Sequence, residues 1–519
     1  MKKALVGLLL GVSLLISGCG NSAPTRETLP DLETAPPVIN QPQTGYDRTG
    51  PGVLHQENLP NGVNFELYMD GRVLLTGGDI TFSLVDQNAY KDYADRIVII
   101  ELGEGVTRVV EKGLEKAEKV QKIIVGDGVT YIGYRAFADC AAMTQITLGA
   151  GLTEISDYAF AGCASLKDVN LGGNITAIGN YCFSGCSALK SVIVGHNVTR
   201  IGNYAFADCV ELDQITFGDG LVEIANYAFK GCSKLTDLDL GGNIETIGRY
   251  CFSGCTALKS AYLGNKITKM GEYIFDECTS LSSLRVACNV GEDSLNKITN
   301  LSTIVLEDTV TSIAERAFTG CADLQNVTFS KNLETIGAYA FADCAKLKEV
   351  KLTESVKTIG DQCFSGCASL VRAEIGSNVV TMGKLLFNGC AALDTIKCNS
   401  NVGESSFQNA TALQSVELGA NVKSIGNQGF QGCAALVNLV LPNGLETIGD
   451  RAFYDCSGMK LLSLPDSLKR VGAEIISGTA SLQTLEYRGY YESQWKKIKL
   501  DLNWNRNAGL NFPTVFRTS

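Results

Sequence analysis

The chain has 519 residues, more than a single globular core usually holds, so it contains either several domains or an array of repeats. Hydrophobic residues make up 45% of it and charged residues 19%, which excludes a chain that is disordered throughout. The net charge of −11 argues against nucleic acid or an anionic membrane surface as the main partner.

The first 19 residues have the features of an export signal. Two lysines precede an apolar run, Ala4–Ile16, which is too short for a comfortable transmembrane helix. The run ends in Ile-Ser-Gly-Cys at Cys19, which resembles the lipobox of bacterial lipoproteins, where the cysteine is diacylated and becomes the new N-terminus. An ordinary signal peptide with a chance cysteine is the alternative. We therefore predict a lipoprotein signal peptide at 1–19 and a lipid anchor on the extracellular face of the bacterial cell membrane.

Two segments separate this signal from the regular part of the chain. Residues 20–60 are rich in Pro, Thr, Asn and Gln, which is typical of a disordered, extended tether. Within residues 61–96, the stretch 63–77 has Asp70-Gly71 at its centre and predicts a β-hairpin. We expect this segment to form the N-terminal cap of the structure that follows.

The segment 97–487 consists of an internal repeat, and one column of large apolar residues recurs every 23 residues. In most copies Leu stands six residues after this column, Val, Ile or Leu three residues further on, and another apolar residue two residues after that. The column counts 17 copies. Two of the steps from one copy to the next are only 20 residues long. Its members are Leu114, Phe137, Phe160, Phe183, Phe206, Phe229, Phe252, Phe275, Leu295, Phe318, Phe341, Phe364, Phe387, Phe407, Phe430, Phe453 and Ile476.

This spacing predicts the secondary structure of each copy. Leu-x-x-Val-x-Leu ends in period-two alternation, which is typical of a short strand with one buried face. A Gly/Asn turn, a second short apolar segment and a tight turn follow. Because one copy cannot bury its apolar residues alone, the copies must stack, and the sequence predicts a β-rich solenoid of the leucine-rich-repeat type.

The pattern resembles the BspA-like leucine-rich repeat family of bacterial surface proteins. Members of that family carry units of the form Ile-Gly-x-x-Ala-Phe-x-x-Cys-x-x-Leu, which the stretch from Ile201 to Leu212 matches. The resemblance covers about residues 97 to 487. It implies a solenoid fold and, beyond that, adhesion or surface recognition; it supplies no catalytic residues.

A longer period lies on top of the repeat. The block that begins at Cys251 recurs 112 positions later at Cys363, and each block contains one 20-residue unit. We infer a duplication of five repeats. We expect each shortened unit to kink or bulge the solenoid, whereas a straight, unbroken strand stack at 286–300 and 398–412 would contradict this prediction.

The periodicity decays at the C-terminal end, where residues 488–519 hold both tryptophans, Trp495 and Trp504. The stretch 491–498 resembles the terminal segment often found in the same family. We interpret 488–519 as an aromatic C-terminal cap, and an aromatic binding tip is the alternative.

Nineteen cysteines in an exported protein would normally indicate disulfides. Thirteen of them, however, share one column three residues after the Phe, from Cys140 to Cys456. Side chains stacked in one column point the same way, which suits packing better than the disulfide torsion, so we predict a buried thiol ladder. Three Cys-x-x-x-Cys pairs leave metal binding as an alternative, but no His lies in those motifs, and we expect neither a metal nor a cofactor.

Two series of residues are candidates for a binding surface. The first is a tyrosine stripe two residues before the Phe, which is interpreted either as a packing ladder or as a stacking surface for glycan or peptide. The second is the outward residue of each predicted strand, which differs from repeat to repeat. The stripe comprises Tyr158, Tyr181, Tyr204, Tyr227, Tyr250 and Tyr273, and the candidates on the strands include Ile193, Asp239, Tyr262, Arg285, Lys351 and Glu374.

The leading functional hypothesis is a cell-surface lipoprotein that acts as a binding or adhesion module through its solenoid. Its expected partner is a host or neighbouring-cell surface protein or glycan. A structural spacer or envelope component without a specific ligand is the alternative. The only two histidines, His55 and His196, have no Ser or Asp partner at a recognisable spacing, so we predict no enzymatic activity.

Overall fold

The computed structural model describes residues 52–489, 492–506 and 515–516. The chain divides into two units, Met1–Arg48 and Thr49–Ser519, and all of the described residues belong to the second. The predicted signal peptide at 1–19 with Cys19, and residues 20–51 of the predicted tether, lie outside the described residues.

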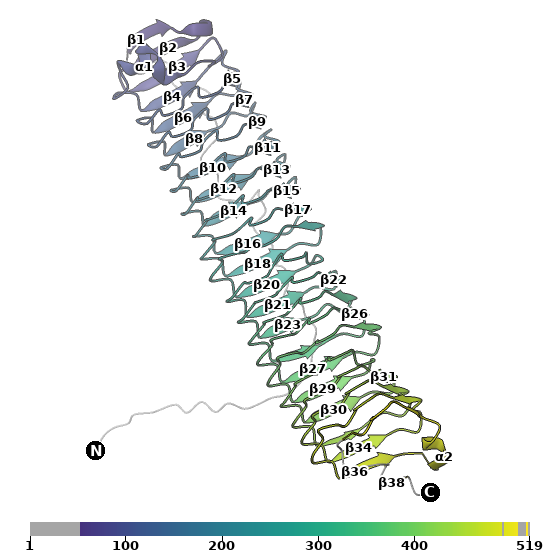
Figure 1. Cartoon of the computed structure of the whole chain (residues 1–519). Helices are drawn as coiled ribbons and strands as arrows, with labels where there is room; N and C mark the ends of the chain where they lie inside the picture. The colour runs from purple at the N-terminus through teal and green to yellow at the C-terminus, as the bar shows by residue number, and fades with distance from the viewer. Residues whose placement is uncertain (1–51, 490–491, 507–514, 517–519) are drawn as a thin grey trace, which may run out of the picture. The chain divides into compact units, whose positions relative to one another are not determined.

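The repeats form a β-solenoid in which each regular, 23-residue repeat contributes one longer strand to one side and one two-residue strand to another (Figure 1). We call the first side the long-strand face. Its parallel strands are β4 (Ile99–Leu102), β6 (Lys122–Val125), β8 (Gln145–Thr147), β10 (Asp168–Leu171), β12 (Ser191–Val194), β14 (Gln214–Thr216), β16 (Asp237–Leu240), β18 (Ser260–Leu263), β20 (Ser283–Val286), β21 (Thr303–Leu306), β23 (Asn326–Thr328), β25 (Glu349–Lys351), β27 (Arg372–Ile375), β29 (Thr395–Cys398), β30 (Ser415–Leu418), β32 (Asn438–Val440), β34 (Leu461–Leu464) and β36 (Thr484–Tyr487).

The second side is the short-strand face, which is also parallel. Its strands are β5 (Arg108–Val109), β7 (Tyr131–Ile132), β9 (Glu154–Ile155), β11 (Ala177–Ile178), β13 (Arg200–Ile201), β15 (Glu223–Ile224), β17 (Thr246–Ile247), β19 (Lys269–Met270), β22 (Ser312–Ile313), β24 (Thr335–Ile336), β26 (Thr358–Ile359), β28 (Thr381–Met382), β31 (Ser424–Ile425), β33 (Thr447–Ile448), β35 (Arg470–Val471) and β37 (Lys499–Leu500).

The alternation in the sequence explains the long strands. In β10, Val169 and Leu171 are buried, whereas Asp168 and Asn170 point outward. Each residue lies beside its equivalent in the next repeat, as Val169 does beside Val192 and Ile178 beside Ile201. Because the register is one whole repeat, identical apolar columns align, and the stacking predicted from the sequence is confirmed.

The third side of the solenoid is a series of tight turns that carries the phenylalanine column inward. Every member of that column is at most 1% exposed. Neighbouring Phe rings are stacked, with centroids 5.1 to 5.9 Å apart and ring planes that differ by 3 to 28°. The column therefore forms the central ladder of one continuous hydrophobic core, as predicted.

The two 20-residue repeats interrupt only part of this architecture. On the long-strand face β20 pairs with β21, and β29 with β30, each over four residues in register. On the short-strand face the series ends at β19 and again at β28. The predicted local disturbance is therefore confirmed for the short strands and wrong for the long strands, because the three missing residues are removed from the turn between the two strands.

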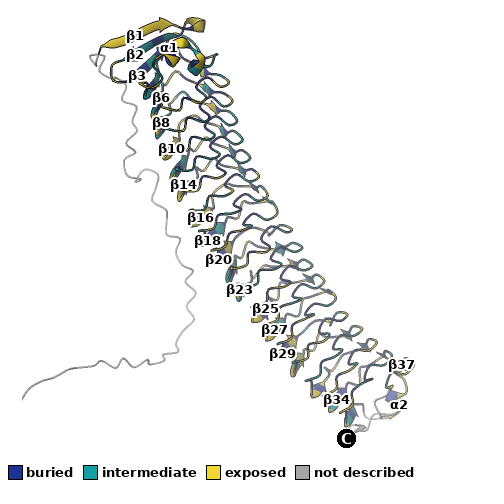
Figure 2. Ribbon diagram, turned by 60° about the vertical axis from the view of Figure 1, so that its left-hand side comes forward, coloured by how far each residue is buried: buried dark blue, intermediate teal, exposed yellow. Residues whose placement is uncertain are grey.

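The N-terminal part adds antiparallel strands to the first repeat. Strands β2 (Asn64–Tyr68) and β3 (Arg72–Thr76) form the hairpin predicted around Asp70-Gly71, and β3 pairs in parallel with β4. Strand β1 (Val53–Asn58) pairs with β2, so the predicted tether boundary at residue 60 is wrong. The sequence did not reveal β1 because this edge strand is almost wholly exposed, mostly yellow in Figure 2, and lacks apolar alternation.

Short helical segments complete the ends. Two 3-10 turns, Pro60–Gly62 and Leu84–Asp86, and helix α1 (Asn88–Lys91) lie between the hairpin and β4. After β36, helix α2 (Glu492–Trp495) precedes β37, which extends the short-strand face, and β38 (Val515–Phe516) pairs with β36. Trp495 and Trp504 are buried and meet edge to face, with centroids 5.5 Å apart, so their rings are not displayed as a binding tip.

Candidate binding surfaces

The outward residues of the long strands lie beside one another in two groups. Asp239 lies beside Tyr262, and Tyr262 beside Arg285, on the neighbouring strands β16, β18 and β20. Lys351 lies beside Glu374 on β25 and β27. Ile193 lies on β12 between Asn170 and Thr216, so the structure does not bring it next to either group.

The side chains of Tyr262 and Arg285 form a fixed arrangement. The guanidinium carbon of Arg285 lies 5.1 Å from the centroid of the Tyr262 ring, which is a cation–π distance. The Arg285 Nε atom lies 2.5 Å from Oε1 of Glu307, just after β21. Glu307 was not among the residues predicted from the sequence, because nothing in a single repeat indicates a partner 22 positions away.

The second group consists of charges that form ion pairs with one another. The Nζ atoms of Lys351 and Lys397 lie 3.4 and 3.8 Å from the two carboxylate oxygens of Glu374. All three side chains are at least one third exposed, so water and salt weaken these pairs. The three side chains sum to one positive charge, which Glu417, beside Lys397 on β30, balances, so this part of the face has little net charge available to attract a partner.

The tyrosine stripe forms a stack on the turn side. From Tyr158 to Tyr273 the ring centroids are 4.6 to 5.2 Å apart and the ring planes differ by 5 to 15°. Each ring face contacts the next ring, which leaves the ring edges toward solvent. Partial burial and the neighbouring Tyr227 raise the pKa of Tyr204. Such a stack stabilises the turns, and a ligand reaches ring faces only at its ends.

Every tyrosine of the stripe adopts a left-handed backbone conformation, with φ between 53 and 58°. The same column in other repeats holds residues such as Arg316, Gln362 and Glu474, again with positive φ. This conformation costs a non-glycine residue roughly 1–2 kcal/mol. Ring stacking offsets part of that cost in the tyrosine repeats, which explains why a large aromatic residue is tolerated there.

The cysteines of the described residues are all free and buried, which confirms the predicted thiol ladder. In the thirteen-member column, each thiol donates a hydrogen bond to the backbone carbonyl of the Phe or Leu one repeat earlier, as Cys186 does to Phe160 over 3.3 Å. Burial raises the pKa of Cys321 to about 12. These groups are therefore protonated packing residues rather than nucleophiles.

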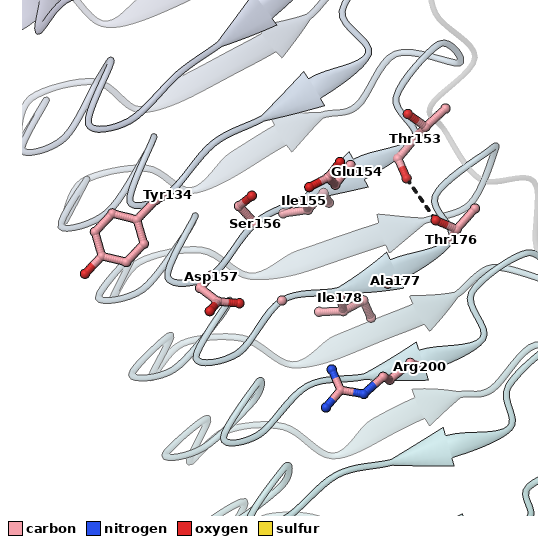
Figure 3. A pocket seen from close by; sticks show the side chains of 11 residues that line it. Tyr134, Thr153, Glu154, Ile155, Ser156, Asp157, Thr176, Ala177, Ile178 and Arg200 are labelled. Carbon is pink, nitrogen blue, oxygen red and sulfur yellow. Dashed lines mark hydrogen bonds between the residues drawn. The ribbon is translucent and has the colours of Figure 1, made fainter.

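A shallow hollow of about 570 Å³ lies over β9, β11 and β13, with Tyr134 and Asp157 at one end and Arg200 at the other (Figure 3). Two of its charged groups already have partners within the solenoid. Asp157 accepts a hydrogen bond from the Asn180 amide over 2.6 Å, and Arg200 lies 3.2 Å from Glu223. The hollow thus results from the small residues between side-chain columns, and its lining was not among the predicted sites.

One pair of titratable groups was missed in the sequence. The Nδ1 atom of His196 lies 2.7 Å from Oδ1 of Asp219, its equivalent one repeat later, and both side chains are exposed. Within the described residues, no cluster of three or more His, Cys, Asp or Glu side chains could hold a metal ion. The helices of the described residues are too short and too polar to cross a membrane.

Comparison with solved structures found leucine-rich repeat proteins of low sequence identity. One from Bacteroides ovatus has 21% identity and a TM-score of 0.42, with 84% of this chain and 97% of that chain covered. A leucine-rich cell surface protein from Faecalibacterium prausnitzii has 20% identity and a TM-score of 0.30, with 86% and 97% covered. The leucine-rich repeat protein of T. pallidum has 20% identity and a TM-score of 0.25, with 55% and 86% covered. No curated protein matches the sequence.

The family comparison agrees with the repeat seen in the structure. The model of the BspA type leucine-rich repeat region, which spans six copies of the repeat, matches residues 84–212, 176–292, 289–404 and 399–498. These matches cover well over half of the chain. The protein belongs to the BspA type leucine-rich repeat family.

Proposed function

We propose that this solenoid is a binding module that holds a protein partner on its long-strand face, with Tyr262 and Arg285 at the centre of the contact. Their arrangement with Glu307 is the observation that carries the proposal. Tyrosine and arginine are the residue types enriched at the energetic centres of protein interfaces. Both side chains are held by neighbouring repeats, so little conformational entropy is lost when a partner binds.

The position of the pair supports the same conclusion. Tyr262 and Arg285 lie in the middle of the array, with long strands on both sides. Solenoid sheets serve as extended recognition surfaces because neighbouring repeats present their outward residues in one row. On the central column of the long-strand face, Asp239 lies beside Tyr262 and Val305 beside Arg285. Further along the same column, Thr216 and Thr328 are small and uncharged.

We further propose that the module acts as an adhesin at the cell surface, anchored through a diacylglyceryl group on Cys19. The apolar run before Cys19 and the polar, proline-rich stretch after it support this location. The expected partner is a surface protein of a host or of a neighbouring cell. A glycan partner is an outcome that the experiment below distinguishes.

The test is a binding screen of the full chain against immobilised extracellular-matrix proteins and glycans. For a partner found in the screen, Tyr262→Ala and Arg285→Ala should each raise the dissociation constant about 30-fold, equivalent to about 2 kcal/mol of binding energy. The matched control is Arg249→Ala. The Arg249 guanidinium lies 5.4 Å from the Tyr250 ring and 2.9 Å from Glu272, which repeats the same chemistry on the turn side.

Two results would overturn the proposal: a screen without any ligand, or equal loss of binding in the test and control variants. The first would favour the second candidate function, a spacer without a specific ligand. The pairing of Lys351 and Lys397 with Glu374 favours that candidate, because these charges already have partners on the same face. The anchor is tested separately, since palmitate labelling should disappear in Cys19→Ala.

A further inference from the structure

The two short repeats separate the short-strand face into three series while leaving the other sides joined. The first series ends at Met270 and the second at Met382, and each new series begins with a single bridge, Val290 to Ile313 or Val402 to Ile425. Figure 1 shows the resulting step between β17 and β22. The turn side stays connected, since the amide of Leu385 still donates to the carbonyl of Glu404 over 3.1 Å.

Each new series supplies its own hydrogen-bond acceptors. In a regular repeat, the carbonyl of Glu245 accepts the amides of Thr268 and Lys269 in the next repeat. After the first break, the side-chain Oδ1 of Asn289 takes this role and accepts the amides of Thr311 and Ser312 over 2.8 and 3.0 Å.

Asn401 repeats the arrangement after the second break, where it accepts the amides of Lys423 and Ser424 over 2.8 and 3.0 Å. The short strand after each break therefore does not depend on the series before it for these two hydrogen bonds. When two series separate on the short-strand face, the amides of the short strand that follows the break keep their asparagine acceptor.

The repeat before each break also has smaller or more adaptable core side chains than its neighbours. It carries Ala261 or Ala373 where most repeats have Val, Ile or Leu, and Met270 or Met382 where most have Ile. Both methionines are only partly buried, and methionine is the most adaptable apolar side chain. At the second break, the amide of Gly403 meets the Met382 sulfur at 3.4 Å, where a regular repeat has a backbone hydrogen bond.

From these observations we infer that both breaks are hinges. The uninterrupted pairs β18–β20 and β27–β29, which join the long strands across the two breaks, act as the pivot, and the corner between long and short strands, where three residues are missing, opens and closes. Such hinges change the curvature of the long-strand face at two places five repeats apart. The inference does not rest on the proposed function, although Tyr262, Arg285 and Glu307 span the first hinge.

The test measures distances by pulsed electron spin resonance in the full chain, with spin labels carried on non-canonical residues so that the native thiols are not needed. One pair of labels replaces Glu223 and Thr335, which are five repeat steps apart across the first break. The control pair replaces Arg108 and Glu223, also five steps apart but within the first series. Each span contains one interruption of strand pairing on the long-strand face, so the two pairs are matched in this respect. The interruption lies between β14 and β16 for the test pair and between β8 and β10 for the control pair.

We expect a broader distance distribution for the pair across the break than for the control pair. A distribution of equal width would overturn the hinge. A second variant replaces residues 287–289 with a copy of residues 264–269, which restores a 23-residue repeat. This variant should narrow the distribution to that of the control pair, and a folded variant that stays broad would also contradict the inference. If this variant does not fold, the comparison of the two label pairs in the chain without the insertion decides alone whether the break is a hinge.

Discussion

The thiol of Cys209 donates a hydrogen bond to the backbone carbonyl of Phe183, the central phenylalanine of the preceding repeat, over 3.3 Å. This carbonyl also accepts the backbone amide of Cys186 over 3.2 Å, and the thiol occupies its second acceptor position inside the core. The thiol therefore combines two properties that a core position needs here, a small apolar volume and a weak donor. This explains why the column holds cysteine rather than alanine or serine in most repeats.

The buried thiols predict an alkaline limit to stability. Burial raises the pKa of Cys398 to about 11 and that of Cys321 to about 12, from a usual value of 9.0. A raised pKa in the folded state means that the stabilisation is complete below about pH 9 and is lost as the pH rises toward the folded value, because only the unfolded chain ionises.

The midpoint of urea unfolding should therefore fall steadily above pH 9. Each buried thiol contributes a slope of about 1.4 kcal/mol per pH unit in that range. Removal of one thiol in Cys321→Ala should reduce the slope, which separates the thiols from lysines and tyrosines that titrate nearby. An unchanged slope in this variant would contradict the assignment.

Asp79 predicts a second pH effect, at the start of the short-strand face. Its Oδ1 atom accepts the amides of Thr107 and Arg108, both over 2.9 Å, as Asn289 and Asn401 do after the two breaks. Burial acts to raise the pKa of Asp79, but the hydrogen bonds from Thr107 and Arg108 outweigh it, and the pKa lies below its usual 3.8.

A lowered pKa means that the stabilisation from Asp79 is present above about 3.8 and is lost as the pH falls through the lower folded value. Asp79→Asn should keep the acceptor and remove this pH dependence. Asp79→Ala should cost about 1–2 kcal/mol at neutral pH, because two amides lose their partner. Thermal unfolding of the three proteins at neutral pH and well below pH 3.8 measures both effects; equal stability of the Asn and Ala variants would refute the role of the oxygen.

In the tyrosine stripe, we expect the Gly variant to be more stable than the Ala variant, which reverses the usual order of stability. At Tyr204, where φ is 54°, Gly fits the left-handed backbone and Ala does not. Tyr204→Gly should therefore be about 1 kcal/mol more stable than Tyr204→Ala, although both lose the same stacking. Chemical unfolding of the two variants tests this order. The control is the same pair of substitutions at Thr216, on a strand with extended backbone, where Ala should be the more stable.

The last prediction concerns the C-terminal segment as a cap. Trp495 is 2% exposed and packs edge to face against Tyr487, with centroids 5.3 Å apart. Trp495→Ala should cost about 3–5 kcal/mol and loosen the final repeats first, because each repeat is supported only by its neighbours. Hydrogen exchange should accelerate in β35 and β36 but not in β12. Leu502→Ala is the matched control, since Leu502 is 84% exposed in the same segment.

The spacing of apolar residues alone determined the solenoid and its core columns. The column counts 17 copies, whereas the described residues form 18 long strands, because β4 precedes Leu114, the first residue of the column. A side-chain column recurs in the sequence with the same period that stacks it in space, so burial of Phe206 in one copy implies burial of Phe229 in the next. The buried thiols followed from the same reasoning. Strand β1 escaped because its pairing depends on backbone hydrogen bonds, which leave no apolar pattern.

Only the tertiary structure decided what happens between repeats. That Arg285 reaches Glu307, that His196 meets Asp219 and that Asn289 replaces a backbone carbonyl all depend on rotamers and on the sideways offset between neighbouring turns. The sequence predicted a disturbance at each short repeat, but not that it is confined to the short strands. The physical reason is that deleting three residues from a turn shortens one corner of the solenoid, while the register of the long strands is held by their own hydrogen bonds.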